Sequence, residues 1–316
     1  MSFQALSSRA IVGRFYRALE QDLGEGWVNS LAMLFSSDQE SETYKWLGQV
    51  PAMREWVGGR LAKPLRDDGI TIVNKEWEAT LEIPRVWMER DKTGQIQVRI
   101  NELAARAQSH WADLLSALII NGESATVDGK NNTCYDGQSF FDTDHSEGSS
   151  GTQSNSISSD ITTTTAPTVA EMQTAILQGM QQIIGFKDDQ GLPLNAAARR
   201  FVVMVPTPFI ASCAGALGAS VIAQTDSTIK ALGALGGVTF EMFFNPRLTW
   251  TTKFAVFRAD GNVKPFIKQE EDGVRVEAVA EGSELVFNEK VHRYGISARR
   301  NVGYGYWQHA CLVTFT

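Results

Sequence analysis

The residues best suited to chemistry form one short run, Phe140-Phe141-Asp142-Thr143-Asp144-His145. Two carboxylates and an imidazole after apolar residues could hold a metal ion, and an Asp-x-Asp pair after a strand is typical of phosphotransferases with an aspartyl nucleophile. Those enzymes would carry a Thr two residues after the second Asp, where this chain has Ser146. No supporting Lys follows at a convincing position. We therefore predict a structural turn in which Asp side chains accept backbone amides, and no catalysis.

Other candidate sites fail on spacing. Gly129-Lys130-Asn131 lacks the Ser or Thr that a phosphate-binding loop places after its lysine, and Ser124 stands where the first glycine of that loop belongs. The three cysteines, Cys134, Cys213 and Cys311, form no CxxC pair, and the four histidines do not cluster with them. We predict free, mostly buried thiols, no metal site and no cofactor.

Composition narrows the class of protein further. The chain has 316 residues, 43% hydrophobic content and a formal net charge of −7. Such a chain is a poor general binder of nucleic acid, which requires clustered Lys and Arg. No secretory signal is visible, and the uncharged run 201–223 contains prolines and β-branched residues. We read it as a buried strand, a turn and a helix, with Thr207 as N-cap and Pro208 as first helical residue, and we expect no membrane association.

The elements around these residues follow from periodicity. Residues 1–48 are expected to form an amphipathic arm that packs on a neighbouring subunit. Residues 51–92 carry eight basic and eight acidic side chains. Within them one strand alternates in polarity, with an apolar face that we expect a neighbouring subunit to cover; Ile70 and Ile72 mark its expected partner strand. That face consists of Trp77, Ala79, Leu81 and Ile83.

The rest of the chain mixes helices and strands. A stripe from Ile100 to Leu118 predicts a long helix over 95–121, stopped by Asn121-Gly122. Residues 122–168 read as loops, and Thr168 with Glu171 forms a capping box before a second helix. After a buried strand and a third helix, the chain is rich in strands to its end. The fold class predicted from these elements is α+β.

Three blocks of sequence resemble the Mu-like prophage major head subunits. The first runs from Tyr44 to Gly58, and the second comprises Asn74-Lys75, Glu78-Ala79-Thr80 and Ile83-Pro84-Arg85. The third runs from Thr133 to His145. They occur in the family's order and spacing, and the resemblance is clearest over about residues 40–150.

This resemblance implies a Hong Kong 97-like capsid fold. It assigns residues 1–48 to an N-terminal arm, 49–92 to an extended β-hairpin loop, and 93–165 to a peripheral domain with a spine helix. Residues 166–261 would form the axial domain, and 262–316 the C-terminal part of the peripheral domain.

The function that the resemblance implies is that of a major capsid protein. Such a protein self-assembles as hexameric and pentameric capsomers into the icosahedral head of a tailed bacteriophage, in the host bacterial cytoplasm, and becomes part of the virion. It would enclose double-stranded DNA without specific binding, and its partners would be portal, scaffold or protease, and decoration proteins. Two alternatives stay open: an encapsulin-like compartment shell, and an Asp-x-Asp hydrolase.

Overall fold

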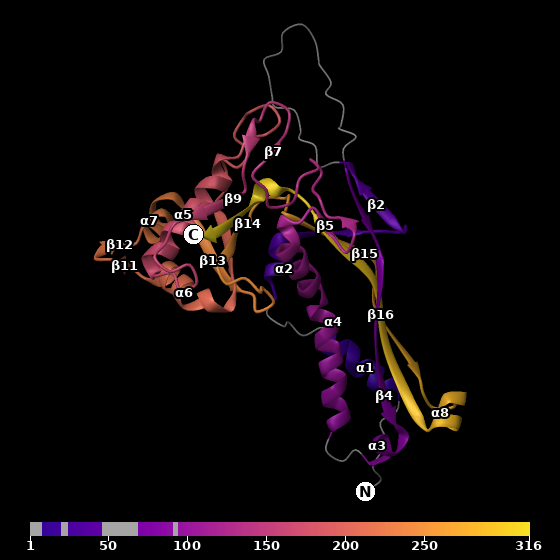
Figure 1. The fold of residues 1–316 in the computed structure, drawn as a ribbon. Helices are drawn as coiled ribbons and strands as arrows, with labels where there is room; N and C mark the ends of the chain where they lie inside the picture. The colour runs from indigo at the N-terminus through magenta and orange to yellow at the C-terminus, as the bar shows by residue number, and fades with distance from the viewer. Residues whose placement is uncertain (1–7, 20–24, 46–68, 91–93) are drawn as a thin grey trace.

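The structure is a computed structural model that describes residues 8–19, 25–45, 69–90 and 94–316. Two sheets and a long helix organise these residues. One sheet is a narrow, elongated ribbon flanked by the long helix, and the other is the centre of a compact body that carries the C-terminus (Figure 1). The mixture of helices and sheets confirms the predicted α+β class.

The elongated sheet has four strands in the order β1-β15-β16-β4. Its members are β1 (Ala32–Ser36), β4 (Lys75–Pro84), β15 (Phe266–Val279) and β16 (Val291–Tyr304). Strand β1 pairs with β15 in parallel, whereas the other two pairings are antiparallel. The short helix α8 (Glu284–Glu289) joins β15 to β16 at the far end of the ribbon (Figure 1).

Helix α4 (Gln95–Ile120) confirms the predicted long helix. Its 26 residues span about 39 Å at 1.5 Å per residue. It begins after Gly94, which has a left-handed φ of 74°, and at its end the side chain of Asn121 donates to the carbonyl of Ala117. Its first half packs in the core under the elongated sheet, whereas Leu115 and Ile119 belong to the core of the compact body. The helix therefore connects the two cores rigidly.

The compact body is built on a five-stranded sheet in the order β13-β10-β14-β17-β9. Strand β10 (Arg200–Val205) is almost wholly buried, as its run of β-branched residues predicts. Helix α5 packs against β14 and β17, and α6 packs against α5 and β13. The remaining bounds are β9 (Ser156–Ser159), β13 (Thr239–Phe244), β14 (Lys253–Arg258), β17 (Ala310–Phe315), α5 (Val169–Gly185), α6 (Ile210–Gly218) and α7 (Thr228–Gly236).

Helix α5 begins as predicted and α6 does not. Thr168 accepts a hydrogen bond from the amide of Glu171, whose carboxylate accepts from the amide of Thr168, which completes the capping box. The expected N-cap at Thr207 is wrong. Thr207 opens a 3-10 turn (Thr207–Phe209) that precedes α6 and makes no side-chain cap. A proline next to it favours the tighter turn over a regular first α-turn.

Among the described residues no helix is long and apolar enough to cross a membrane.

Short elements complete the chain. The short elements are α1 (Ser8–Leu19), α2 (Trp27–Leu31), β2 (Ser41–Tyr44), β3 (Ile70–Val73), α3 (Arg85–Arg90), β5 (Thr126–Val127), β6 (Lys130–Asn131), β7 (His145–Ser146), β8 (Thr152–Gln153), β11 (Val221–Ile222) and β12 (Thr225–Asp226). Two more 3-10 turns span Asn121–Glu123 and Trp307–His309.

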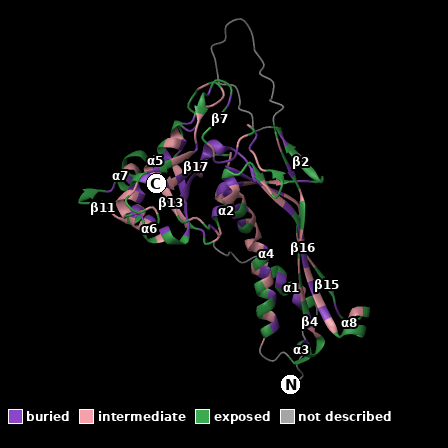
Figure 2. Ribbon diagram, in the orientation of Figure 1, coloured by how far each residue is buried: buried purple, intermediate pink, exposed green. Residues whose placement is uncertain are grey.

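The N-terminal helix α1 is packed against other elements of its own chain. Ile11 and Phe15 of α1 are buried against α4 and the elongated sheet of the same chain. The segment therefore has a partner in its own chain, which the sequence did not reveal, and packing of this arm on another subunit stays a prediction. Its apolar stripe is complementary to the stripe of α4, so the chain buries both at once (Figure 2).

Candidate functional site

The predicted inter-subunit strand is β4, and its polarity alternates as expected. Ile83 is buried, Trp77, Ala79 and Leu81 are half-buried, and the glutamates between them are exposed. The pairing is not as predicted. Strand β3, which contains Ile70 and Ile72, pairs with β2, whereas β4 pairs with β16 from Lys75 opposite Arg300 to Pro84 opposite Val291. The paired residues are thus 207 to 225 positions apart in the chain, whereas local spacing had predicted a partner strand a few residues away.

The apolar face of β4 is covered by the chain itself. Ala79, Leu81 and Ile83 join the core formed by α1, α4 and β16. Trp77 donates from its indole nitrogen to the carbonyl of Arg300 at 2.9 Å, and its ring meets that of His110 edge-on at 4.7 Å. The premise that only a neighbour could bury this face is wrong, because periodicity does not reveal which part of the same chain lies opposite.

Strand β4 still has the position of a contact element. It lies at the edge of the sheet, so among the described residues one side of its backbone carries no partner strand. Of the residues assigned to the extended loop, 46–68 lie outside those that the structure describes, and β2 pairs with β3 in antiparallel fashion. A role of Trp77, Ala79, Leu81 and Ile83 in subunit contact stays a prediction.

Exposed aromatic side chains at the end of the ribbon were not predicted from the sequence. Trp87 in α3 is 66% exposed, and Phe287 in α8 is 85% exposed. The two helices lie at the same end of the sheet, because the amide of Arg85 donates to the carbonyl of Lys290 (Figure 1). Two large exposed rings at one end of a sheet make this end a candidate contact surface. Sequence reasoning missed them because each six-residue helix is too short to show a periodic face.

The acidic cluster is a structural turn, as predicted. The Oδ1 atom of Asp142 accepts the amides of Thr143 at 2.7 Å and Asp144 at 3.2 Å, and Asp144 points into solvent. His145 turns away from both and is fully buried. Its Nδ1 lies 2.6 Å from Oδ2 of Asp136, and its ring stacks on Trp307 at 4.0 Å. Asp136 is the partner that sequence reasoning had not assigned to the histidine.

This arrangement is a poor catalytic site. Asp142 and His145 are held in separate interactions, and in the described part of the chain no three His, Cys, Asp or Glu side chains are placed to share a metal ion. The three cysteines are free and buried, as predicted. Burial raises the pKa of the Cys213 thiol to about 12, so it is protonated and unreactive at neutral pH.

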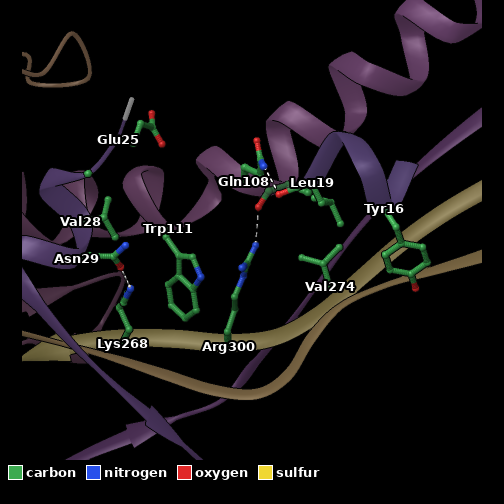
Figure 3. Close-up of a pocket in the computed structure, with 12 residues that line it drawn as sticks. Tyr16, Leu19, Glu25, Val28, Asn29, Gln108, Trp111, Lys268, Val274 and Arg300 are labelled. Atoms are coloured by element: carbon green, nitrogen blue, oxygen red, sulfur yellow. Dashed lines mark hydrogen bonds between the residues drawn. The ribbon is translucent and has the colours of Figure 1, made fainter. Parts of the chain in front are cut away.

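A polar cluster beneath α4 is better organised than the acidic turn, and the sequence did not indicate it. Arg300 on β16 donates from Nε to Nδ1 of His110 at 3.0 Å and from Nη2 to the carbonyl of Ala107 at 2.9 Å. The ring of Trp111 lies between Arg300 and Lys268 (Figure 3). Burial first, and then the charge of Arg300, lower the pKa of His110 to about 4, so its imidazole is neutral at pH 7.

Comparison with known proteins connects this fold to a family. The model of the Mu-like prophage major head subunit gpT family matches residues 7–170 and 245–314. The chain is 40% identical over 130 residues to the Mu-like prophage FluMu major head subunit of Haemophilus influenzae, and 36% identical over 117 residues to the major capsid protein of Escherichia phage Mu. These stretches span 40% and 37% of this chain, and 40% and 36% of the two relatives.

The three-dimensional comparison extends over nearly the whole chain. The procapsid protein of bacteriophage JBD30 matches 96% of it, with a TM-score of 0.55 and 24% sequence identity, and 72% of the JBD30 chain is covered. This likeness confirms the expected Hong Kong 97-like capsid fold. A family match over more than half of the chain, on a capsid fold, shows that this protein belongs to the Mu-like prophage major head subunit family.

Proposed function

We propose that this protein is the major capsid protein of a Mu-like tailed bacteriophage and acts by self-assembly, without catalysis. Copies would form hexameric and pentameric capsomers that close into an icosahedral head around double-stranded DNA. The observation that carries the proposal is the family's sequence over residues 7–170 and 245–314 on a fold found in phage capsids.

Two surfaces support assembly through lateral contacts. Trp87 and Phe287 expose aromatic rings at the end of the elongated ribbon, where burial against another copy would remove apolar area from water. The unpaired edge of β4 offers backbone hydrogen-bonding groups along the same ribbon. A monomer gains nothing from either feature.

The other proposed partners are the proteins with which a phage capsid protein assembles. Portal and scaffold or protease proteins would act during assembly in the host bacterial cytoplasm, decoration proteins would bind the shell, and the finished shell would be part of the virion. The formal net charge of −7 suits a container that holds DNA without gripping it. We assign no cofactor and no metal ion.

The test is imaging of the purified, expressed protein by electron microscopy, with two variants. The parent should form closed shells. Phe287→Ser and Trp87→Ser remove side chains that are mostly exposed in the subunit, so each should reduce particle yield several-fold and leave the subunit's melting temperature unchanged. Leu192→Ser, at another half-exposed apolar site, is the control and should assemble normally.

Images also separate the alternatives. Small cages loaded with an enzyme would favour the encapsulin-like compartment shell. Discrete oligomers with hydrolytic turnover would favour the Asp-x-Asp hydrolase, against which the burial of His145 already counts.

A further inference from the structure

A cavity of about 560 Å³ lies beneath α4, between that helix, α1, α2 and the strands β15 and β16 (Figure 3). Its wall combines apolar groups such as Val28 and Val274 with two cationic side chains, Lys268 and Arg300. Neither the fold nor the proposed function accounts for this cavity.

Both cations are nearly inaccessible in the folded chain. Lys268 is 5% exposed and Arg300 is 4% exposed. They lie on either side of Trp111, with Nζ of Lys268 5.5 Å and Cζ of Arg300 4.7 Å from the ring centroid. The ring face attracts both charges, but such contacts contribute far less free energy than is lost when an ammonium group is removed from water.

The two cations are compensated to different degrees. Arg300 has a neutral imidazole, a carbonyl and the carboxylate of Glu270, whose Oε1 lies 4.0 Å from Nη1. Within the part of the chain that the structure describes, Lys268 makes one hydrogen bond, from Nζ to Oδ1 of Asn29 at 2.7 Å. Among the described residues no carboxylate lies within 4.0 Å of its Nζ. Glu25, on the cavity wall, is paired with Arg247 at 2.8 Å.

The cavity therefore holds a surplus of positive charge. Two cations face it, and among the described residues Glu270 is the carboxylate that offsets them. Its Oε1 lies 4.0 Å from Nη1 of Arg300, and its charge acts on Lys268 without a direct ion pair. An ammonium group can donate three hydrogen bonds, and Lys268 uses one of them in the protein. A buried ammonium group with unused donors is stabilised most effectively by an anion that accepts hydrogen bonds from them.

We propose that this cavity is an oxyanion-binding site in which Lys268 is the principal ligand and Arg300 the second. The ligand is a carboxylate or a phosphate group, with an adjoining apolar portion packed on Trp111. It could come from solution or from an acidic side chain of a second copy of this chain. The second source rests on the proposed function, whereas the site itself does not.

Asn29 offers a sharp test, because Asn29→Asp places a carboxylate beside Lys268 with almost no change in shape. The unassembled subunit would be titrated with inorganic phosphate, against chloride at equal ionic strength, while its melting temperature is followed. At phosphate concentrations above the dissociation constant the parent should gain about 2 to 4 °C. Asn29→Asp should be more stable without phosphate and gain little from it.

Two lysine variants complete the design. Lys268→Met keeps the length of the side chain and removes its charge, so it should fold and lose the response to phosphate. Lys187→Met removes an exposed lysine elsewhere and should respond as the parent does. The proposal is overturned if the parent shows no gain over chloride, or if Lys268→Met and the parent gain equally.

Assembled particles then identify the source of the anion. If phosphate still stabilises shells of the parent, the site takes its ligand from solution. If the response is present in subunits and absent in shells, an acidic side chain of a second copy occupies the cavity. Failure to assemble would contradict the proposed function only, because the titration of subunits does not depend on assembly.

Discussion

Arg300 donates a hydrogen bond from Nε to Nδ1 of His110 across 3.0 Å, which fixes the tautomer of the histidine. Because a guanidinium can only donate, Nδ1 must accept, and the proton of the neutral ring lies on Nε2. Protonation of Nδ1 would break this hydrogen bond and place two cations side by side. The pair joins β16 to α4, so its protonation state is linked to the stability of the ribbon.

The pKa of His110 predicts a loss of stability in acid. It is lowered from 6.5 to about 4, by burial first and by Arg300 second, although Asp113 opposes the shift. Below pH 6.5 His110 binds a proton in the unfolded chain and stays neutral in the folded chain. The free energy of unfolding therefore falls as the pH decreases from 6.5 to about 4. The loss is on the order of 2 to 3 kcal/mol. Urea unfolding of the subunit at several pH values measures it.

His110→Gln isolates that contribution, because the amide oxygen of Gln can accept from Arg300 and does not titrate. The variant should lose less stability than the parent between pH 6.5 and 4. Buried His309, whose pKa is lowered to about 3, titrates in both proteins and serves as a common background. Equal slopes for the two proteins would show that the His110–Arg300 contact does not carry the effect.

Trp77→Asp should unfold the subunit before it affects the shell. The indole donates to the carbonyl of Arg300 and packs on His110, so a half-buried carboxylate that replaces it should cost about 2 to 4 kcal/mol. We expect few particles from Trp77→Asp, because its subunits are unstable. Trp77→Phe, which loses only the hydrogen bond, should cost about 1 kcal/mol. Circular dichroism melts of subunits give both values, and an unchanged melt for Trp77→Asp would restore a neighbour as the partner of this face.

The buried pair of Asp136 and His145 should be essential to the loop region. Asp136→Asn leaves the fully buried imidazole without a charged partner and should cost about 3 kcal/mol or more. Asp144 is exposed, so Asp144→Asn, the matched control, should change the free energy of unfolding by less than about 0.5 kcal/mol. Chemical denaturation compares the two, and equal effects would exclude the pair as a stabilising contact.

The acidic turn should be inert toward phosphate esters. An aryl phosphate would be incubated with the parent and with Asp142→Asn, and metal content would be measured in both. We expect no turnover and no stoichiometric metal, because Asp142 accepts two backbone amides and lies apart from the histidine. Turnover in the parent that Asp142→Asn abolishes would establish an enzyme.

Isolated subunits should bind duplex DNA negligibly at physiological salt, and the inner face of the shell should be neutral to acidic. Each phosphate that Lys or Arg neutralises adds about 0.9 to the salt dependence of binding, and a chain of net charge −7 offers few such contacts on average. Anisotropy titration with random duplex tests this. Micromolar binding that weakens steeply with added salt would reveal a concealed basic face.

Close packing of α5 on the compact sheet predicts a contrast between two glycines of one helix. A methyl group on Gly179 would lie 2.9 Å from Cγ2 of Val256, whereas one on Gly185 meets nothing within 4 Å. Gly179→Ala should therefore destabilise the subunit by about 1 to 3 kcal/mol, and Gly185→Ala should be neutral or stabilising. Thermal melts of the two variants test this contrast. Equal melting temperatures would mean that α5 can shift on the sheet to make room for the added methyl group.

Elements that depend on nearby residues could be predicted from the sequence. The spacing of apolar residues placed α4 within one residue of its observed end, and the pairing of Thr168 with Glu171 placed the start of α5. The alternation along β4 and the turn at Asp142 were also predictable, because each depends on residues a few positions apart. Family sequence then supplied the fold that local pattern could not.

Tertiary structure alone decided which surfaces meet. Strand β4 pairs with β16, α1 covers α4 in the same chain, and His145 takes Asp136 as its partner. Lys268 and Arg300 flank Trp111 although more than 150 residues separate them from it in the chain. An apolar face or a charge in a sequence shows that a partner is needed. Its identity depends on the closure of long loops, whose free energy is set by the whole fold rather than by neighbouring residues.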